Sequence, residues 1–284
     1  MAVIYALGCL CFSALNDFVF KLYARKDRSR GIFVFLCGVL WVFLLGLRPV
    51  DWENSLAPTL TWGIVSGLFS VISNLLLIEA MGFQSAGVCA TIFRLNLVIV
   101  VIAAILWLGE TVTFFQVLGI LCAIGAILAF MPRGTKFRVD ENSRAMLGIY
   151  LVLAACILRA GMGLTYKYGF LHGADPNGVP LLNGVCWIVG GLVYAVLREK
   201  KIRFSKKTVG YGMLSGALLC GIVFFMALML NAGAASVTLS IAQMSFLGTF
   251  ALSMIFLKEK LTSRTALAVV LGVCAILFLS AFPK

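Results

Sequence analysis

Apolar runs of about twenty residues recur along the whole of this 284-residue chain. An α-helix needs about that length to cross the hydrocarbon core of a bilayer. Hydrophobic residues make up 62% of the sequence and charged residues only 12%, whereas a typical soluble domain has about half and about a quarter. The pattern therefore predicts an all-α integral membrane protein that crosses the bilayer many times.

The apolar runs predict ten transmembrane helices. They cover residues 2–24, 31–48, 59–80, 85–108, 111–131, 146–170, 177–197, 208–230, 234–257 and 262–281.

The chain carries one block of sequence twice. A shift of 149 residues aligns residues 63–113 with residues 212–262 without a gap. Upstream of that block a shift of 146 aligns further positions, among them Lys21 with Lys167. The duplication therefore spans nearly the whole chain.

The duplication predicts the domain organisation. Residues 1–131 form a first five-helix repeat, residues 132–145 a linker, and residues 146–284 a second five-helix repeat. Because five is odd, the second repeat must start on the opposite side of the membrane from the first. We therefore expect two inverted repeats around a central cavity, a common plan of secondary transporters.

Basic residues gather in alternate loops. Of the 23 Lys and Arg residues, 17 follow the first, fifth, seventh and ninth predicted helices, and only Arg48 and Lys284 lie on the other side. Short loops rich in Lys and Arg stay in the cytoplasm, beside anionic lipid headgroups. The net charge of +12 therefore indicates a multi-pass protein of the cytoplasmic membrane with both termini outside, and no nucleic-acid partner is expected.

Six charged residues, the four remaining basic residues and two acids, lie within the predicted helices: Asp17, Lys21, Glu79, Arg94, Arg159 and Lys167. A charged side chain at the centre of a spanning helix costs about 2.5–3.5 kcal/mol on insertion scales. Such residues therefore usually face a cavity or a partner. Arg94 and Arg159 lie deep within their helices, so for these two we favour a function.

Helical spacing suggests which of these residues share a site. Asn16, Asp17 and Lys21 lie on one face of the first helix, where Asp17 and Lys21 can pair. The third helix presents a polar stripe, and the sixth presents a second polar face. The predicted substrate-binding residues are Asn16, Asp17, Lys21, Asn74, Arg94, Arg159, Tyr166 and Gln243, of which Gln243 is the repeat partner of Arg94.

Some of these residues have plainer interpretations. Lys21 can extend from its helix end to the interface, Glu79 can be an ordinary carboxylate at a helix end, and Asp17 with Lys21 can be a structural ion pair. Asp17 and Glu79 are the only acids within the predicted helices. If protons drive transport, one of these two carboxylates should titrate.

The end of the fourth helix resembles a known family. Residues 108–113 read LGETVT and are echoed by LKEKLT at 257–262; both resemble the short re-entry between the fourth and fifth helices of EamA-type transporters in the drug/metabolite transporter superfamily. Asn16 and Lys21 resemble the Asn and Lys of that family's first helix. The resemblance implies alternating access to a cavity lined by helices 1, 3, 4, 6, 8 and 9, with helices 5 and 10 peripheral.

The sequence departs from that family in two respects. Many members carry a proline midway along the fourth and ninth helices, where this chain has residues 95–98 and 245–248 without proline. The helix break that proline would produce is therefore not predicted here. Members with ten helices are also often described with both termini inside, whereas the distribution of basic residues places them outside.

The sequence predicts secondary transport of a small polar or amphipathic metabolite. An anionic or zwitterionic metabolite, such as one that resembles an amino acid, is favoured. Arginine binds carboxylates and phosphates through paired hydrogen bonds, so Arg94 and Arg159 would hold the anionic group. The alternative is an exporter of cationic or aromatic drug-like compounds, held by Asp17, Glu79, Tyr166 and the tryptophans. The lone histidine, His172, leaves no evident catalytic dyad for an intramembrane enzyme, and the short loops do not favour a scaffold.

Nine cysteines are scattered singly through the predicted helices, so neither a metal site nor any other cofactor is expected. Proton coupling is left open. The expected partners are a small-molecule substrate and the lipid bilayer, and the protein is expected to be a monomer or a homodimer.

Overall fold

The computed structural model describes residues 1–24, 28–80, 83, 89, 92–129, 143–200, 204–257 and 262–281. Its helices are α1 (Ala2–Ala24), α2 (Arg30–Gly46), α3 (Trp52–Ala80), α5 (Asn96–Trp107), α6 (Phe114–Ala129), α7 (Ser143–Leu171), α8 (Gly178–Tyr194), the π-helix η1 (Ala195–Glu199), α9 (Lys206–Ala232), α10 (Ala235–Gln243), α11 (Ser245–Leu257) and α12 (Ser263–Ala281).

These helices confirm the predicted all-α fold. In the described residues, six helical stretches are long and apolar enough to cross a membrane, and four more are apolar but shorter. The stretch Gly178–Glu199 combines α8 with η1, and Ala235–Phe256 combines α10 with α11. The ten predicted crossings therefore correspond to ten helical stretches.

The third helix begins seven residues earlier than predicted, at Trp52 instead of residue 59. Asp51 caps its start, because its Oδ1 accepts a hydrogen bond from the Asn54 backbone N–H at 3.2 Å. Hydrogen bonds from Asn54 also hold the pKa of the Asp51 carboxyl below its usual value. The hydropathy pattern missed this polar first turn because it follows apolar composition and not capping.

The packing of the helices reflects the sequence duplication. Helices α2 and α8 hold the same place in the two repeats, and they pack against each other. The pair α1 and α9 corresponds to the pair α7 and α3, and both pairs are in contact, as are α2 with α9 and α8 with α3. Each contact between two of these helices therefore has a counterpart between the corresponding helices of the other repeat, as expected for two five-helix repeats that pack together.

Glycines at matched positions allow this close packing. A Cβ atom on Gly67 of α3 would lie 2.6 Å from the Cys186 Sγ of α8. A Cβ on Gly216 of α9, the repeat partner of Gly67, would lie 3.1 Å from the backbone of Cys37 in α2. The two small-xxx-small motifs at 63–67 and 212–216 thus serve helix packing.

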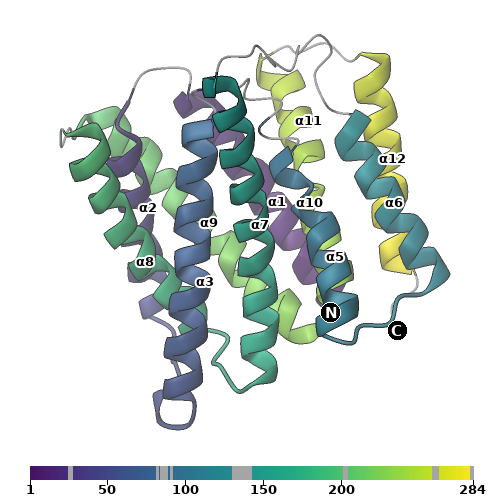
Figure 1. The fold of residues 1–284 in the computed structure, drawn as a ribbon, viewed down its shortest axis with the longest axis horizontal. Helices are drawn as coiled ribbons and strands as arrows, with labels where there is room; N and C mark the ends of the chain where they lie inside the picture. The colour runs from purple at the N-terminus through teal and green to yellow at the C-terminus, as the bar shows by residue number, and fades with distance from the viewer. Residues whose placement is uncertain are drawn as a thin grey trace.

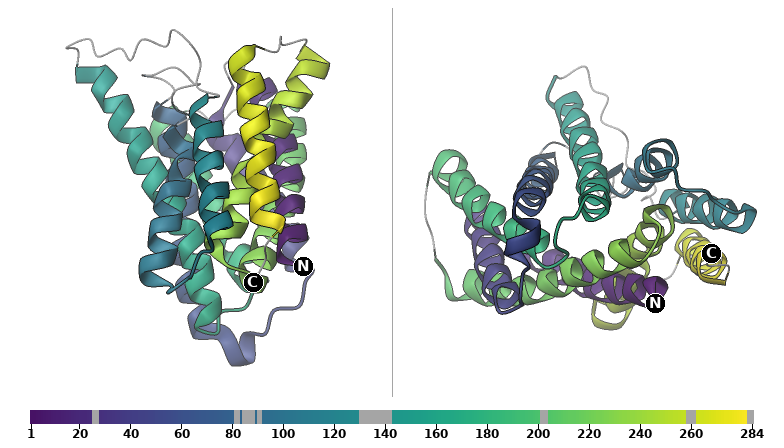
Figure 2. Two further views of the ribbon diagram at one scale, coloured as in Figure 1. Left: turned by 90° about the vertical axis from the view of Figure 1, so that its right-hand side faces the viewer. Right: turned by 90° about the horizontal axis from the view of Figure 1, so that it is seen from below.

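Both termini lie at one end of the bundle (Figure 1). The first repeat begins at that end with α1, whereas α7 begins the second repeat at the opposite end (Figure 1). The repeats therefore run in opposite directions, as the odd number of helices requires. Seen from the side, the helices stand roughly side by side, with the N and C labels near the same end (Figure 2).

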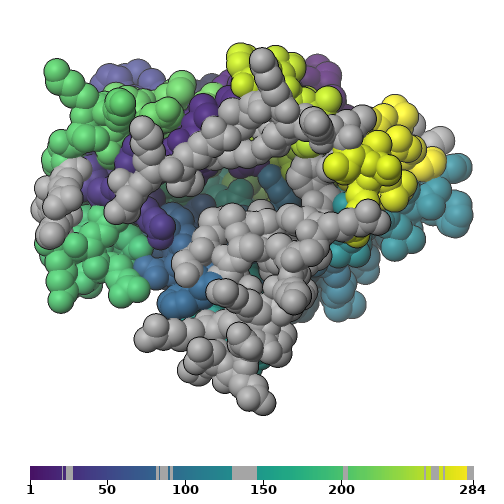
Figure 3. Space-filling view, turned by 90° about the horizontal axis from the view of Figure 1, so that it is seen from above, coloured from purple at the N-terminus to yellow at the C-terminus, as the bar shows by residue number. Residues whose placement is uncertain are grey.

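Helices α6 and α12 form a pair at the edge of the molecule, apart from α2 and α8 (Figure 3). The start of α6 is fixed by a reciprocal cap, in which the Thr113 N–H donates to Gln116 Oε1 at 2.9 Å and the Gln116 N–H donates to Thr113 Oγ1 at 3.3 Å. The structure therefore confirms the peripheral position implied for the fifth and tenth helices.

Candidate functional site

The fourth and ninth crossings are interrupted at matched positions. At Leu95 the backbone N–H bonds to the Ile92 oxygen, and at Met244, 149 residues later, the N–H bonds to the Ile241 oxygen. On the far side of each break, Val98 bonds to Leu95 and Leu247 bonds to Met244, again three residues back. Both helices are therefore broken although neither carries the proline, because these tight turns form without it.

A guanidinium group replaces a missing backbone donor at the second break. The Gln243 carbonyl loses its usual helical partner, because the N–H of Leu247 bonds to Met244 instead. Arg94 supplies the substitute, with its Nη1 3.1 Å from the Gln243 oxygen. In return, Gln243 Nε2 donates to Asn96 Oδ1 at 2.9 Å. The two breaks therefore meet and bind each other.

Arg94 also forms an ion pair with the first helix. Its Nη2 lies 2.6 Å from Asp17 Oδ2, and its Nη1 lies 3.1 Å from the Ser245 hydroxyl. The Ser245 hydroxyl is itself 3.4 Å from Asp17 Oδ2. The side chains of Arg94 and Asp17 remain 19% and 37% exposed, so a ligand can reach both partners of the pair.

The structure gives Asp17 an ion-pair partner that helical spacing did not predict, and the pair with Lys21 stays a prediction. The expected pair with Lys21 would lie along one helix, whereas the observed ion pair joins α1 to the residues just before α5. The side chain of Lys21 lies outside the described residues. Asp17 and Arg94 are 77 positions apart, and local helical spacing cannot show such a contact.

Arg159 of α7 belongs to the same electrostatic environment. It interacts electrostatically with Cys9 and Tyr166, and more weakly with Asp17 and Arg94. Among the described residues, the hydrogen-bond partner of its guanidinium is the sulfur of Met162, at 3.2 Å. Because a thioether is a weak acceptor, most of the donors of Arg159 are left for another group.

Asn16 lies beside Asp17 in the chain but contacts a different helix. Its Oδ1 accepts a hydrogen bond from the Ser215 hydroxyl of α9 at 2.6 Å. Asn16 is only 5% exposed. In this conformation Asn16 holds α1 against α9.

Two other predicted residues are used within the helix bundle. Tyr166 is fully buried, and its hydroxyl donates to Asn183 Oδ1 of α8 at 3.2 Å. Asn74 donates through Nδ2 to the Ser70 oxygen of its own helix at 2.9 Å. Among the described residues, no hydrogen bond connects either side chain to Arg94 or Asp17.

The tryptophans and Glu79 also lie elsewhere. Trp41 and Trp187 are buried and contact each other, with ring centroids 5.6 Å apart. Glu79 binds the Tyr194 hydroxyl at 2.7 Å and Arg198 at 3.1 Å, where α3 ends beside α8 and η1. The acidic and aromatic groups of the cation alternative are therefore not brought to one place.

Sequence reasoning missed two residues of the site, Asn96 and Ser245. A signal was available, because the shift of 149 aligns Asn96 with Ser245 just as it aligns Arg94 with Gln243. Two matched polar pairs, two positions apart on otherwise apolar helices, mark the point where the repeats meet.

A carboxylate and an ammonium group hold the bundle at the end where the termini lie. Glu110 accepts hydrogen bonds from the N–H groups of Ala235 and Ser236, at 2.6 and 3.0 Å, and so caps the start of α10. Lys167 Nζ donates to the carbonyls of Leu230 and Gly233, at 3.0 and 2.8 Å, where α9 ends. The turn between α9 and α10 is thereby tied to the first repeat and to α7.

The charges at the site favour ligands with a negative group. Two guanidinium groups and one carboxylate interact there, and the carboxylate is shared between Arg94 and Ser245. Within the described part of the chain, no three His, Cys, Asp or Glu side chains gather as metal ligands would. The arrangement can bind a carboxylate or phosphate through arginine and an ammonium group through Asp17.

The comparisons with known proteins agree with this architecture. One solved crystal structure of a protein superposes on this chain with a TM-score of 0.79. The match covers 99% of this chain and 96% of the other chain. Only 13% of the residues are identical, so the likeness shows a shared fold. No curated protein sequence matches the chain.

A model of the EamA-like transporter family matches residues 1–131 and again residues 146–281. These matched ranges include both helix breaks, the Arg94 ion pair and the contacts of Glu110 and Lys167 with the turn between α9 and α10. By these two matches over nearly its whole length, the chain belongs to the EamA-like transporter family.

Proposed function

We propose that this protein transports a small zwitterionic or anionic metabolite, bound at the Asp17–Arg94 ion pair with Arg159 close by. Membership of the family makes the chain a secondary transporter in the membrane and not an enzyme. The observation that carries the proposal is the partly exposed Asp17–Arg94 contact of 2.6 Å, next to an arginine that has no carboxylate partner among the described residues.

A zwitterion matches this pair better than a simple cation does. Its carboxylate can take the place of Asp17 on Arg94 while its ammonium group takes the place of Arg94 on Asp17. Each charge then keeps an opposite charge, which avoids the cost of leaving either charge unpaired within the bundle. A cation at Asp17 would leave Arg94 without a carboxylate and would be repelled by Arg159.

Arg159 gives the site a preference for a second negative group. A dicarboxylate or a phosphate can bridge Arg94 and Arg159, because each guanidinium has donors arranged as a fork. The same residues therefore suit amino acids, dicarboxylates and phosphate esters.

A thermal-shift screen of the purified protein tests the proposal. The compounds are amino acids, dicarboxylates, sugar phosphates and aromatic amines. A ligand at a hundred times its dissociation constant stabilises the folded state by about 2.7 kcal/mol, which raises the midpoint of unfolding measurably. We expect stabilisation by the first three classes, lost in Arg94→Gln and in Arg159→Gln.

The control is Arg264→Gln, because Arg264 is exposed at the start of the peripheral helix α12. This variant should respond to ligands as the wild type does. Stabilisation by aromatic amines alone, unchanged in both site variants, would contradict the proposal and point to a cation site. Compounds that stabilise the protein are then tested for uptake into proteoliposomes.

Proton coupling through Asp17 is part of the proposal. When a ligand carboxylate displaces Asp17 from Arg94, the negative charge of Asp17 must be balanced by an ammonium group or removed by a proton. We therefore expect uptake of a ligand without an ammonium group to acidify the vesicle lumen, and Asp17→Asn to abolish this acidification. Uptake with no change in lumenal pH would show exchange or facilitated diffusion instead.

A further inference from the structure

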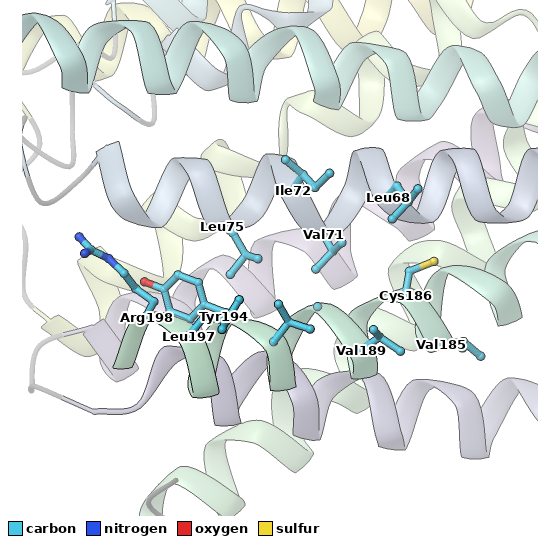
Figure 4. A pocket seen from close by; sticks show the side chains of 12 residues that line it. Leu68, Val71, Ile72, Leu75, Val185, Cys186, Val189, Tyr194, Leu197 and Arg198 are labelled. Atoms are coloured by element: carbon cyan, nitrogen blue, oxygen red, sulfur yellow. The ribbon is translucent and has the colours of Figure 1, made fainter. Parts of the chain in front are cut away.

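An apolar groove runs along the outer face of α3 and α8 (Figure 4). Its volume is about 510 Å³, within the range of about 300–1,000 Å³ of small-molecule sites. Ten of the twelve lining residues are apolar or glycine: Leu68, Val71, Ile72, Leu75, Val185, Cys186, Val189, Gly190, Val193 and Leu197. The two polar ones, Tyr194 and Arg198, lie at one end.

Close packing of the two helices forms the floor of the groove. A Cβ atom on Gly190 would lie 2.5 Å from Val71 Cγ2, so the Val71 side chain of α3 packs directly on the Gly190 backbone of α8. On either side of this contact, Ile72 and Val189 stay exposed and form the walls. In a membrane protein this face meets the lipid, so an alkyl chain is the group that fits between such walls.

The polar end of the groove presents an oriented guanidinium. Arg198 donates through Nε to Glu79 Oε1 at 3.1 Å and through Nη2 to Glu79 Oε2 at 3.2 Å. The Tyr194 hydroxyl donates to the same carboxylate at 2.7 Å. Because a guanidinium has five N–H donors, three donors of Arg198 have no partner among the described residues. The Arg198 side chain is 64% exposed.

Other charges at this end leave it electropositive. Arg30 and Lys200 are exposed beside Arg198, and Arg30 interacts electrostatically with Glu79. The second carboxylate there, Glu199, already accepts hydrogen bonds from the N–H groups of Arg30 and Gly31, at 2.7 and 3.0 Å. Among the described residues, both carboxylates of this region accept hydrogen bonds, while Arg198 keeps donors without a partner.

The length of the groove corresponds to one leaflet. From Val185 to Arg198 the helix axis advances by roughly 20 Å at about 1.5 Å per residue. Half of the hydrocarbon core is about 15 Å thick. An anionic group held by Arg198 would therefore lie at the headgroup level, and the chain attached to it would reach the middle of the bilayer.

We propose that this groove is a binding site for an anionic phospholipid, with the phosphate on Arg198 and one acyl chain between α3 and α8. The site is distinct from the Asp17–Arg94 pair and does not depend on the function proposed for it. A lipid at this position joins α3 of the first repeat to α8 of the second, so it stabilises the contact between the repeats.

Native mass spectrometry of the detergent-purified protein tests this proposal. The protein is mixed with phosphatidylglycerol or with phosphatidylcholine of the same acyl chains. We expect phosphatidylglycerol to be retained about fivefold more, the effect of one basic residue near an anionic headgroup. Soluble glycerol phosphate should not compete, because it lacks the chain that fills the groove.

Two variants separate the headgroup contact from the chain contact. The double variant Glu79→Gln with Arg198→Gln keeps the net charge of the protein and should abolish the preference for phosphatidylglycerol. Val189→Trp should fill the groove and lower retention of both lipids. The matched controls Arg264→Gln and Val270→Trp alter exposed positions of α12 and should retain lipid as the wild type does.

Equal retention of the two lipids by the wild type would overturn the proposal, as would unchanged lipid binding in both groove variants. A dimer mass that is lost in Val189→Trp would show instead that a second copy of the chain covers the groove. Arg198→Lys gives a further check, because it keeps the charge and should keep most of the preference.

Discussion

Arg94 joins three parts of the chain through one side chain. It binds the Asp17 carboxylate, the Ser245 hydroxyl and the Gln243 carbonyl. The carbonyl lacks its helical donor, so Arg94 has a structural role in addition to the proposed binding role. A ligand that takes Arg94 away from Asp17 would act on the point where the two repeats meet.

At this scale we predict that Arg94→Gln destabilises the protein even without ligand. The shorter amide cannot reach both the Gln243 oxygen and Asp17, and a buried acceptor left unsatisfied costs about 1–3 kcal/mol. Arg94→Lys keeps the charge but not the forked donors, so its loss should be smaller. Denaturation of the ligand-free protein in detergent measures both, and equal stability of Arg94→Gln and wild type would refute the structural role.

At the scale of elements, the packing of α2 with α9 depends on a residue without a side chain. A Cβ atom on Gly216 would lie 3.1 Å from the Cα and the carbonyl oxygen of Cys37, and backbone atoms cannot move aside as a side chain can. By contrast, a Cβ on Gly210, one and a half turns earlier in the same helix, would meet nothing within 4 Å.

We therefore predict opposite effects of the same substitution at these two positions. Gly216→Ala should lower the free energy of unfolding by about 1–3 kcal/mol through overpacking. Gly210→Ala should raise it by up to about 1 kcal/mol, because alanine favours the helix more than glycine does. Thermal unfolding of the two variants in one detergent measures the difference, and equal shifts would show that α9 and α2 do not pack this closely.

At the scale of the whole molecule, charge is divided between the two ends of the bundle. Helices α2 and α9 begin, with Arg30 and Lys206, at the end away from the termini, and Arg48 follows the opposite end of α2 (Figure 1). Lys- and Arg-rich ends of short-loop membrane proteins remain in the cytoplasm. The orientation that we propose therefore places both termini outside.

Reporter fusions in a bacterial host test this orientation. Alkaline phosphatase fused after Lys284 should be active, because that enzyme needs the disulfide-forming space outside the cytoplasmic membrane. A green fluorescent protein fused after Lys200 should fluoresce, and phosphatase at the same position should be inactive. The reverse pattern at both positions would place the termini inside.

The sequence by itself determined the class of the protein, its ten crossings, its duplication and the inversion of its repeats. These follow from apolar length, from a shift of 149 residues and from an odd number of helices, and each can be read along the chain. The sequence also identified Asp17, Arg94 and Arg159 as costly charges that need partners, because the energy of a charge in hydrocarbon depends on its depth.

Only the tertiary structure decided which partners those charges have. Asp17 pairs with Arg94, the Tyr166 hydroxyl binds Asn183, and Glu79 binds Arg198 at the far end of α3. The helix breaks at Leu95 and Met244 also formed without proline. The reason is that these features depend on where helices from different repeats cross, and helical periodicity describes only one helix at a time.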